Sequence, residues 1–184
     1  MKVRCAWANT NELLTEYHDR EWGMPSHDEA YLFEMLNLEG AQAGLSWLTI
    51  LSRREAYRKA FDSFNPHVIA QYDEQKRAEL LQDSGIIRNR LKINAVIENA
   101  KACLATQSVY GNFDQYLWGF VGDKKLTEAD HDMAEEISKQ MSKALKKQGF
   151  RFVGPTTCYS FMQSVGMIND HSPACFKYTN ATTK

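Results

Sequence analysis

The sequence predicts an all-α fold, and three features support this prediction. Apolar residues recur at intervals of three and four, whereas the strict alternation that marks half-buried strands is nearly absent. Capping residues and prolines stand directly before several apolar stretches. Of the 184 residues, 43% are hydrophobic, which is enough to bury a sizeable core, and this length suits a single domain spanning residues 1–184.

The first half of the chain contains three predicted helix starts. Thr10 or Asn11 is expected to cap a short helix, and Asp28 is expected to cap a second, leucine-rich helix. Asn65 stands directly before Pro66, so a capping residue precedes a proline at the first helical position. Each start is followed by apolar residues at helical spacing, which predicts a buried face.

The second half is expected to hold longer helices. The break at Ser84-Gly85 is expected to separate one helix from a long helix that includes residues 93–100. Apolar residues then recur every four positions over residues 133–145, and Gly154-Pro155 starts a final apolar helix. Only residues 122–132 are expected to form a polar loop or linker.

Composition limits the classes of protein to which the chain belongs. The 22 basic and 23 acidic residues leave a net charge of -1, so a polyanionic partner must be bound by a local patch. No apolar run approaches the roughly 20 residues of a membrane span, and the N-terminus does not resemble a secretory signal. We therefore expect a cytoplasmic protein with no membrane partner.

Four cysteines are too few and too dispersed for a disulfide scaffold in a chain of this length. Cys103 and Cys158 lie in apolar helical patterns and are expected to be small core residues. The other two belong to Cys5-x12-His18 and His171-x3-Cys175, pairs that together have the composition of a closed Cys2His2 zinc site. Each pair alone is also typical of packed side chains, and the sequence does not show that the pairs meet. Four protein ligands would make the metal structural.

The segment from Leu38 to Trp47 is the second chemical signal. Glu39 stands between an apolar helix and a turn of small residues, and Trp47 offers a flat stacking face. Such a site suits a planar ligand that is cationic or carries an amino group. The alternative is that Glu39 is a solvated helix-end charge and Trp47 a core residue. Tyr17 and Trp22 are further aromatics that are equally consistent with the core.

A helix, a glycine turn and a second helix are expected across residues 83–93. Arg88, Arg90 and Lys92 surround the start of the second helix, where backbone N–H groups attract phosphate. A glycine turn between helices is common, so this pattern is only moderately specific. Arg53-Arg54 is most simply explained as a solvated helix face.

Several of these motifs are similar to those of a known family. The segments in question are Tyr17-His18-Asp19-x-Glu21-Trp22-Gly23, Leu38-Glu39-Gly40-x-Gln42-Ala43-Gly44-Leu45-Ser46-Trp47, Gly85-Ile86-Ile87-Arg88, Gly149-Phe150-x-Phe152-Val153-Gly154 and Asn169-Asp170-His171. Together they closely resemble the bacterial 3-methyladenine DNA glycosylase I family over residues 5–175. The resemblance implies the helix-hairpin-helix glycosylase superfamily, a compact all-α fold with one structural Zn²⁺, and base-excision repair of alkylated DNA.

The resemblance also implies roles for individual residues. The implied zinc ligands are Cys5, His18, His171 and Cys175. The residues implied to embrace the base, and so to make up the catalytic site, are Glu39, Tyr17 and Trp47, with Trp7 and Trp22 as further pocket walls. The residues implied to contact DNA are Gln42 and Leu45, which would probe the duplex, and Gly85, Arg88 and Arg90 of the hairpin.

The chain departs from the wider superfamily in two ways. The usual hairpin has a Gly-x-Gly turn, whereas only Gly85 is present here. The superfamily usually has a catalytic aspartate after the hairpin, and Asp114 is the nearest candidate, without a supporting motif. The resemblance implies that this family lacks the aspartate, so its absence agrees with the assignment.

The activity implied is that of a monofunctional hydrolase that flips 3-methyladenine out of the duplex and leaves an abasic site. Its partners would be double-stranded DNA with alkylated bases and free 3-methyladenine as product, and a monomer is expected. The main alternative is a non-catalytic, zinc-stabilised DNA-damage-binding protein of the same fold. A glycosylase of different base specificity is a further alternative.

Overall fold

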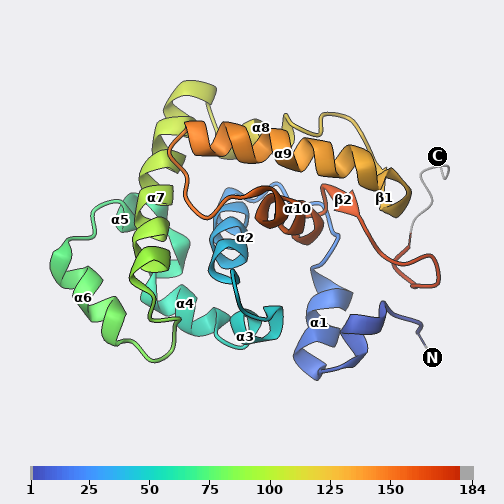
Figure 1. The fold of residues 1–184 in the computed structure, drawn as a ribbon, viewed down its shortest axis with the longest axis horizontal. Coiled ribbons are helices and arrows are strands. Elements are labelled where there is room, and N and C mark those ends of the chain that lie inside the picture. The colour runs from blue at the N-terminus through green and yellow to red at the C-terminus, as the bar shows by residue number, and fades with distance from the viewer. Residues whose placement is uncertain (1, 179–184) are drawn as a thin grey trace.

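The computed structural model describes residues 2–178 and confirms the predominantly helical fold (Figure 1). Its α-helices are α1 (Glu12–Arg20), α2 (Glu29–Ala41), α3 (Trp47–Leu51), α4 (Arg54–Ala60), α5 (Pro66–Ile69), α6 (Glu74–Gln82), α7 (Arg90–Tyr110), α8 (Phe113–Trp118), α9 (His131–Lys147) and α10 (Pro155–Ser164). Three short 3₁₀ helices accompany them: η1 (Ala6–Asn9), η2 (Asp62–Phe64) and η3 (Glu128–Asp130). Within these residues the strands are β1 (Leu126–Thr127) and β2 (Ile168–Asn169).

The predicted capping residues begin three of the helices. The side chains of Asn11, Asp28 and Asn65 each accept a hydrogen bond from a backbone N–H in the first turn of α1, α2 and α5. Asn89 caps α7 in the same way, so the long helix begins at Arg90, after the turn that contains Gly85. These boundaries are set locally, by one side chain and the N–H groups it satisfies.

The prediction of a polar loop or linker over residues 122–132 was correct only for residues 122–125, which form a turn and irregular structure. Leu126 and Thr127 form β1 and pair in parallel with β2, the Asp130 carboxylate accepts hydrogen bonds from Thr127, and α9 begins at His131. A strand of two residues is too short to show an alternating pattern, so this strand could not be predicted from periodicity. The segment is therefore fastened to the C-terminal part of the chain.

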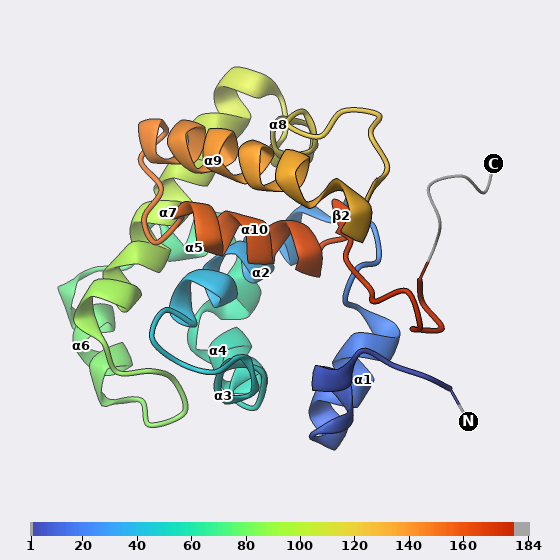
Figure 2. The ribbon, with the colours of Figure 1, turned by 45° about the vertical axis from the view of Figure 1, so that its right-hand side comes forward.

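Helix α2 lies at the centre of the molecule. α10 packs against both α2 and α9, and Figures 1 and 2 show α9 on the outer side of α10. Every residue from 32 to 41 is buried, so α2 is enclosed on all sides rather than amphipathic. This enclosure carries Glu34 and Glu39, two ionisable residues, into the interior.

The two ends of the described chain lie side by side. The N–H of Phe176 donates to the carbonyl of Val3 at 2.9 Å. Figures 1 and 2 show the blue N-terminal segment and the red C-terminal segment on the same side of the molecule, near α1.

Cys103 and Cys158 are buried as predicted. Across residues 2–178, none of the helices has both the length and the apolar character that crossing a bilayer requires.

Candidate functional site

A cavity of about 550 Å³ is lined by residues from η1, α1, α2, α3 and α10, and we call it the aromatic cavity. The predicted site residues that line it are Trp7, Tyr17, Trp22, Glu39, Gln42 and Trp47. α10 adds Ser160 and Gln163, which the sequence analysis did not identify. The structure therefore brings together residues from the range 7–48 and from α10, which lies near the other end of the chain.

Aromatic rings form the walls of this cavity. The ring centroids of Tyr17 and Trp47 lie 5.5 Å apart at an interplanar angle of 51°. Those of Trp7 and Trp22 lie 5.1 Å apart at 80°, an edge-to-face arrangement. Flat side chains around a cavity of this size favour a flat ligand, because each ring offers a π face for stacking.

Two polar atoms of these rings are buried without a hydrogen-bond partner among the described residues. They are the Tyr17 hydroxyl and the Trp47 indole Nε1. Buried donors without partners are rare and costly in folded proteins, so each one requires an explanation. Because both residues line the aromatic cavity, a bound molecule with polar atoms of its own could satisfy them there.

Glu39 supplies the carboxyl group of the cavity. Its residue is only 6% exposed, so the alternative of a solvated helix-end charge is wrong. Burial raises the pKa of Glu39 to about 8, because desolvation penalises the charged form. The Ser164 hydroxyl opposes this shift in part, although it also donates to the Phe161 carbonyl at 2.8 Å. A positively charged ligand would favour ionised Glu39, and an N–H donor would satisfy it.

A second cluster lies next to the aromatic cavity and consists of Cys5, His18, His171 and Cys175. All four residues are buried, and one potential ligand atom from each lies within 4.8 Å of the others. The Cys5 sulfur is 3.6 Å from His171 Nδ1, and the Cys175 sulfur is 3.4 Å from His18 Nε2 and 3.5 Å from His171 Nδ1. The structure thus places the two predicted pairs together.

The outer nitrogens of the two imidazoles have their own partners. His18 Nδ1 lies 2.9 Å from the Asp19 carboxylate, which also pairs with Arg4 at 2.8 Å. His171 Nε2 lies 3.1 Å from the Trp22 carbonyl. Each ring is thereby oriented so that its other nitrogen faces the sulfur atoms, as in metal sites with an ordered outer shell. Trp22 links this cluster to the aromatic cavity, since it also lines the cavity wall.

The remaining predicted site residues lie outside the aromatic cavity. Leu45 is in the loop between α2 and α3, and its side chain is exposed. Gly85 lies in the turn between α6 and α7, where a Cβ atom would come within 2.8 Å of the Ala56 side chain. Arg88 and Arg90 are exposed, and neither forms an ion pair with any residue in the described range.

Lys92 does not share this exposed arrangement with the two arginines. The sequence predicts it beside them as a phosphate-attracting cation, but its ammonium group donates to the backbone carbonyls of Ala41 and Ala43.

Asp114, the candidate for a catalytic aspartate, lies in α8 and contacts His27 at 2.8 Å. It is not among the residues that line the aromatic cavity.

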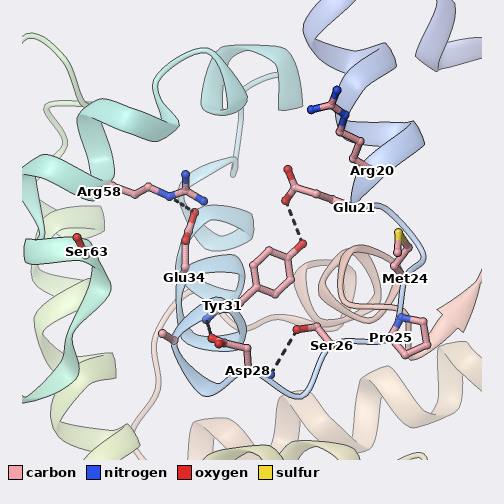
Figure 3. A pocket seen from close by; sticks show the side chains of 11 residues that line it. Arg20, Glu21, Met24, Pro25, Ser26, Asp28, Tyr31, Glu34, Arg58 and Ser63 are labelled. Atoms are coloured by element: carbon pink, nitrogen blue, oxygen red, sulfur yellow. Dashed lines mark hydrogen bonds and ion pairs between the residues drawn. The ribbon is translucent and has the colours of Figure 1, made fainter.

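A second cavity, of about 640 Å³, lies against α2 and α4, and Figure 3 shows its lining. Glu34 and Arg58 point toward one another there at 3.0 Å, and the Tyr31 hydroxyl donates to Glu21. The Arg54 guanidinium forms ion pairs with both glutamates, at 2.6 Å from Glu34 and 2.7 Å from Glu21, and the residue is only 7% exposed. The interpretation of Arg54 as solvated was therefore wrong. No predicted site residue lines this ion-pair cavity, and its buried charges are matched.

Comparisons with known proteins agree with this geometry. The profile of the family described as methyladenine glycosylase matches residues 7–178. A DNA-3-methyladenine glycosylase of Haemophilus influenzae is 46% identical over 180 residues, covering 95% of this chain and 97% of that protein. DNA-3-methyladenine glycosylase 1 of Escherichia coli is also 46% identical over 180 residues, covering 95% of this chain and 96% of that protein.

Solved structures show the same relationship. A crystal structure of 3-methyladenine DNA glycosylase I has a TM-score of 0.90 at 45% identity and covers 96% of this chain and 100% of that one. A tyrosine-to-phenylalanine variant of 3-methyladenine DNA glycosylase I in complex with 3-methyladenine has a TM-score of 0.89 at 35% identity, covering 96% and 98% of the two chains. The chain therefore belongs to the methyladenine glycosylase family.

Proposed function

We propose that this protein is a DNA glycosylase that hydrolyses the N-glycosidic bond of 3-methyladenine in alkylated DNA and leaves an abasic site. The observation that carries the proposal is the aromatic cavity, where the buried Glu39 carboxyl group accompanies two buried polar atoms without partners. The relatives named DNA-3-methyladenine glycosylase support this activity, as does the related structure that holds 3-methyladenine.

The chemistry of the lesion explains why this set of residues suffices. Methylation at N3 gives adenine a positive charge, so the base departs as a neutral molecule when the glycosidic bond breaks and takes the bonding electrons. Water adds to the sugar carbon and loses a proton. A strong general acid is unnecessary, because the leaving group is already activated. The described lining of the aromatic cavity contains no lysine, in agreement with hydrolysis rather than a Schiff-base mechanism.

The residues of the aromatic cavity have distinct proposed roles. The rings of Tyr17 and Trp47 hold the flipped base by stacking, which contributes roughly 1–3 kcal/mol per base. Glu39 accepts a hydrogen bond from the exocyclic amine, and the positive charge of the lesion favours its ionised form. Trp7 and Trp22 complete the walls. Recognition and retention of the flipped base are therefore the main contributions of these side chains.

Binding to the duplex is assigned to the helical hairpin and the loop before α3. Exposed Arg88 and Arg90 lie at the start of α7, where helix N–H groups attract a backbone phosphate. Gly85 allows the hairpin turn to pack closely on α4. Gln42 and Leu45 would probe the duplex at the site that the lesion leaves. Local cations are required for this role, since the net charge of the protein is -1.

We also propose that one structural zinc ion binds the Cys2His2 cluster. Tetrahedral Zn²⁺ with Zn–S bonds of about 2.3 Å and Zn–N bonds of about 2.0–2.1 Å requires sulfur–nitrogen separations of about 3.5 Å. The three separations given above, from 3.4 to 3.6 Å, fit this requirement. Cys5 and His18 would hold the ion together with His171 and Cys175. With four protein ligands the zinc would join the two ends of the chain without supplying an open coordination position.

The activity is tested by incubating the protein with a methylated DNA duplex and identifying the released bases by chromatography. Release of 3-methyladenine, together with an equal number of abasic sites, is the expected result. Tight binding to the methylated duplex without release would instead indicate the non-catalytic damage-binding protein. Release of a different base as the main product would indicate a glycosylase of other specificity.

A further inference from the structure

The side chain of Lys92 joins two segments that are 50 residues apart in the sequence. It comes from the first turn of α7, and its Nζ atom donates to the Ala41 carbonyl at 2.9 Å and to the Ala43 carbonyl at 2.6 Å. Partial burial lowers the pKa of Lys92 from its ordinary value, because desolvation disfavours the charged form. Figures 1 and 2 show the α6–α7 turn and the α2–α3 loop at the same lower edge of the molecule.

The accepting carbonyls lie where α2 ends. The last carbonyls of a helix have no partner within it, and a lysine ammonium group is well suited to satisfy them. The loop that follows is exposed from Ala43 to Ser46, and Gly44 has a positive φ of 76°. Within the loop, the Leu45 N–H donates to the Gln42 carbonyl at 2.7 Å. Lys92 adds two hydrogen bonds from outside the loop and fixes its position relative to α7.

The other end of this connection is equally well held. Arg53 donates to the carbonyls of Ser84 and Gly85, at 2.9 Å and 3.3 Å, and the Tyr57 hydroxyl accepts from the Ile87 N–H at 3.2 Å. The hairpin turn is therefore fastened to the segment around α4. Consequently Arg88 and Arg90 on one side, and Gln42 and Leu45 on the other, belong to one connected unit.

We propose that Lys92 is a positioning residue that couples the hairpin to the Gln42–Leu45 loop, so that binding of the DNA backbone places the loop correctly to open the duplex. This inference rests on the proposed glycosylase function. It differs from the expectation that Lys92 contacts phosphate, because its ammonium group already bonds two carbonyls. Lys92 lies outside the lining of the aromatic cavity, so its effect should be restricted to steps that involve duplex DNA.

The test substitutes Lys92→Met, which keeps the apolar stem and removes the donor. We expect single-turnover release of 3-methyladenine from duplex DNA to fall by about tenfold or more, because misplacing a group away from the reacting bond slows the reaction. Affinity for free 3-methyladenine and for the duplex should stay within about twofold. The fluorescence increase of a 2-aminopurine placed beside the lesion, which reports unstacking, should be reduced. Lys101→Met is the matched control, since Lys101 lies on the same helix and its only ion pair within residues 2–178 is with exposed Glu98.

Other outcomes would overturn the proposal. Weaker duplex binding, with a salt dependence reduced by about one phosphate contact, would show that Lys92 contacts DNA directly. A parallel loss of affinity for the free base would show a general structural role, and unchanged release from duplex DNA would show no coupling. If Lys92→Met does not fold, Lys92→Gln gives the same comparison, and Lys92→Arg should restore release because it keeps charged donors. Failure of the unmodified protein to release any base would refute the proposed function, whereas the fluorescence comparison still tests the coupling.

Discussion

The aromatic cavity and the ion-pair cavity are lined by consecutive residues of one short segment, but their buried polar groups are matched differently. Glu21 lines the ion-pair cavity, and the next residue, Trp22, lines the aromatic cavity. In the ion-pair cavity, Glu34 and Glu21 are matched by Arg54. In the aromatic cavity, Glu39 has no ion pair among the described residues, and two donors have no partner. Cavity size therefore does not distinguish these two cavities as candidate binding sites, whereas their unmatched polar groups do.

The most severe way to disturb this comparison is to disrupt the Cys2His2 cluster, whose His171 contacts the Trp22 carbonyl at the cavity wall. Cys175→Ser should lose the zinc and lower the free energy of unfolding by several kcal/mol, because structural zinc sites contribute roughly 10–16 kcal/mol of apparent binding energy in small domains. Metal analysis and thermal unfolding measure both effects. Cys103→Ser, a buried cysteine outside the cluster, should retain the metal. Full zinc content in Cys175→Ser would disprove the assignment.

The next largest effect is expected in the ion-pair cavity. Arg54→Met should destabilise the protein by about 3–5 kcal/mol, since it leaves the Glu34 carboxylate buried without its closest partner. Denaturant unfolding measures this change. Arg20→Met is the control, because Arg20 lies at the same cavity with a 76% exposed side chain and, among the described residues, forms an ion pair only with Glu16. The affinity of the folded Arg54 variant for free 3-methyladenine should be unchanged, and a large loss would connect this cavity to base recognition.

Replacing a buried charged residue by a neutral one should stabilise the protein in the aromatic cavity, whereas it destabilises the protein in the ion-pair cavity. With a pKa of about 8 in the folded protein and 4.5 as the ordinary value, Glu39 retains a proton between these pH values that the unfolded chain has lost. Stability should therefore fall as pH rises from about 4.5 to 8, at up to about 1.4 kcal/mol per pH unit. Glu39→Gln should remove this dependence and be more stable than the unmodified protein at pH 8. Equal slopes in unfolding experiments from pH 5 to 8 would contradict the assigned burial effect.

Glu39→Gln should at the same time weaken binding of free 3-methyladenine by roughly 1.5–3 kcal/mol, because a charge-assisted hydrogen bond to the amine is lost. Association with DNA should remain nearly intact, since Glu39 is only 6% exposed and so should not contact the DNA backbone. Calorimetry with the free base and a DNA-binding assay measure the two properties. Glu16→Gln, at an exposed position in α1, serves as the control. Unchanged base affinity would remove Glu39 from the recognition site.

The choice of lesion provides the finest comparison. N7-methylguanine is also cationic and labile, but it presents an O6 acceptor where adenine presents its amine, so the Glu39 carboxylate should repel it at a cost of about 1–3 kcal/mol. Neutral lesions such as uracil, hypoxanthine and 1,N6-ethenoadenine should barely be released. Single-turnover rates on matched duplexes measure these differences. Similar rates for N7-methylguanine and 3-methyladenine would refute recognition by Glu39, and rapid release of uracil would refute the proposed dependence on a labile leaving group.

Features fixed by neighbouring residues could be predicted from the sequence. The caps at Asn11, Asp28 and Asn65 depend on a side chain and the next few N–H groups, and all three were confirmed. The two Cys–His pairs of the Cys2His2 cluster were identified from residue type and spacing. Their meeting could not be predicted from spacing alone, since it depends on how the two ends of the chain pack together.

Burial of charged residues was the main feature that the sequence could not provide. Arg53 and Arg54 are consecutive and look equivalent, yet Arg54 is enclosed with two glutamates while Arg53 holds the hairpin turn. Glu39 is buried because α2 is covered on all sides by other helices. Ser160 and Gln163 were missed, although polar residues three positions apart in an apolar helix were a usable signal.

The contact between the two ends of the chain also has a consequence for synthesis on the ribosome. The His171 imidazole orients against the Trp22 carbonyl, and the Cys5 sulfur lies beside the same ring, across a sequence separation of 166 residues. A nascent chain in which Trp7, Tyr17 and Trp22 have already left the ribosome therefore cannot fix that wall of the aromatic cavity until residue 171 has also been added. We expect a chain whose translation stops before residue 171 to contain the sequences of all ten described α-helices but to lack the His171 contact that holds Trp22.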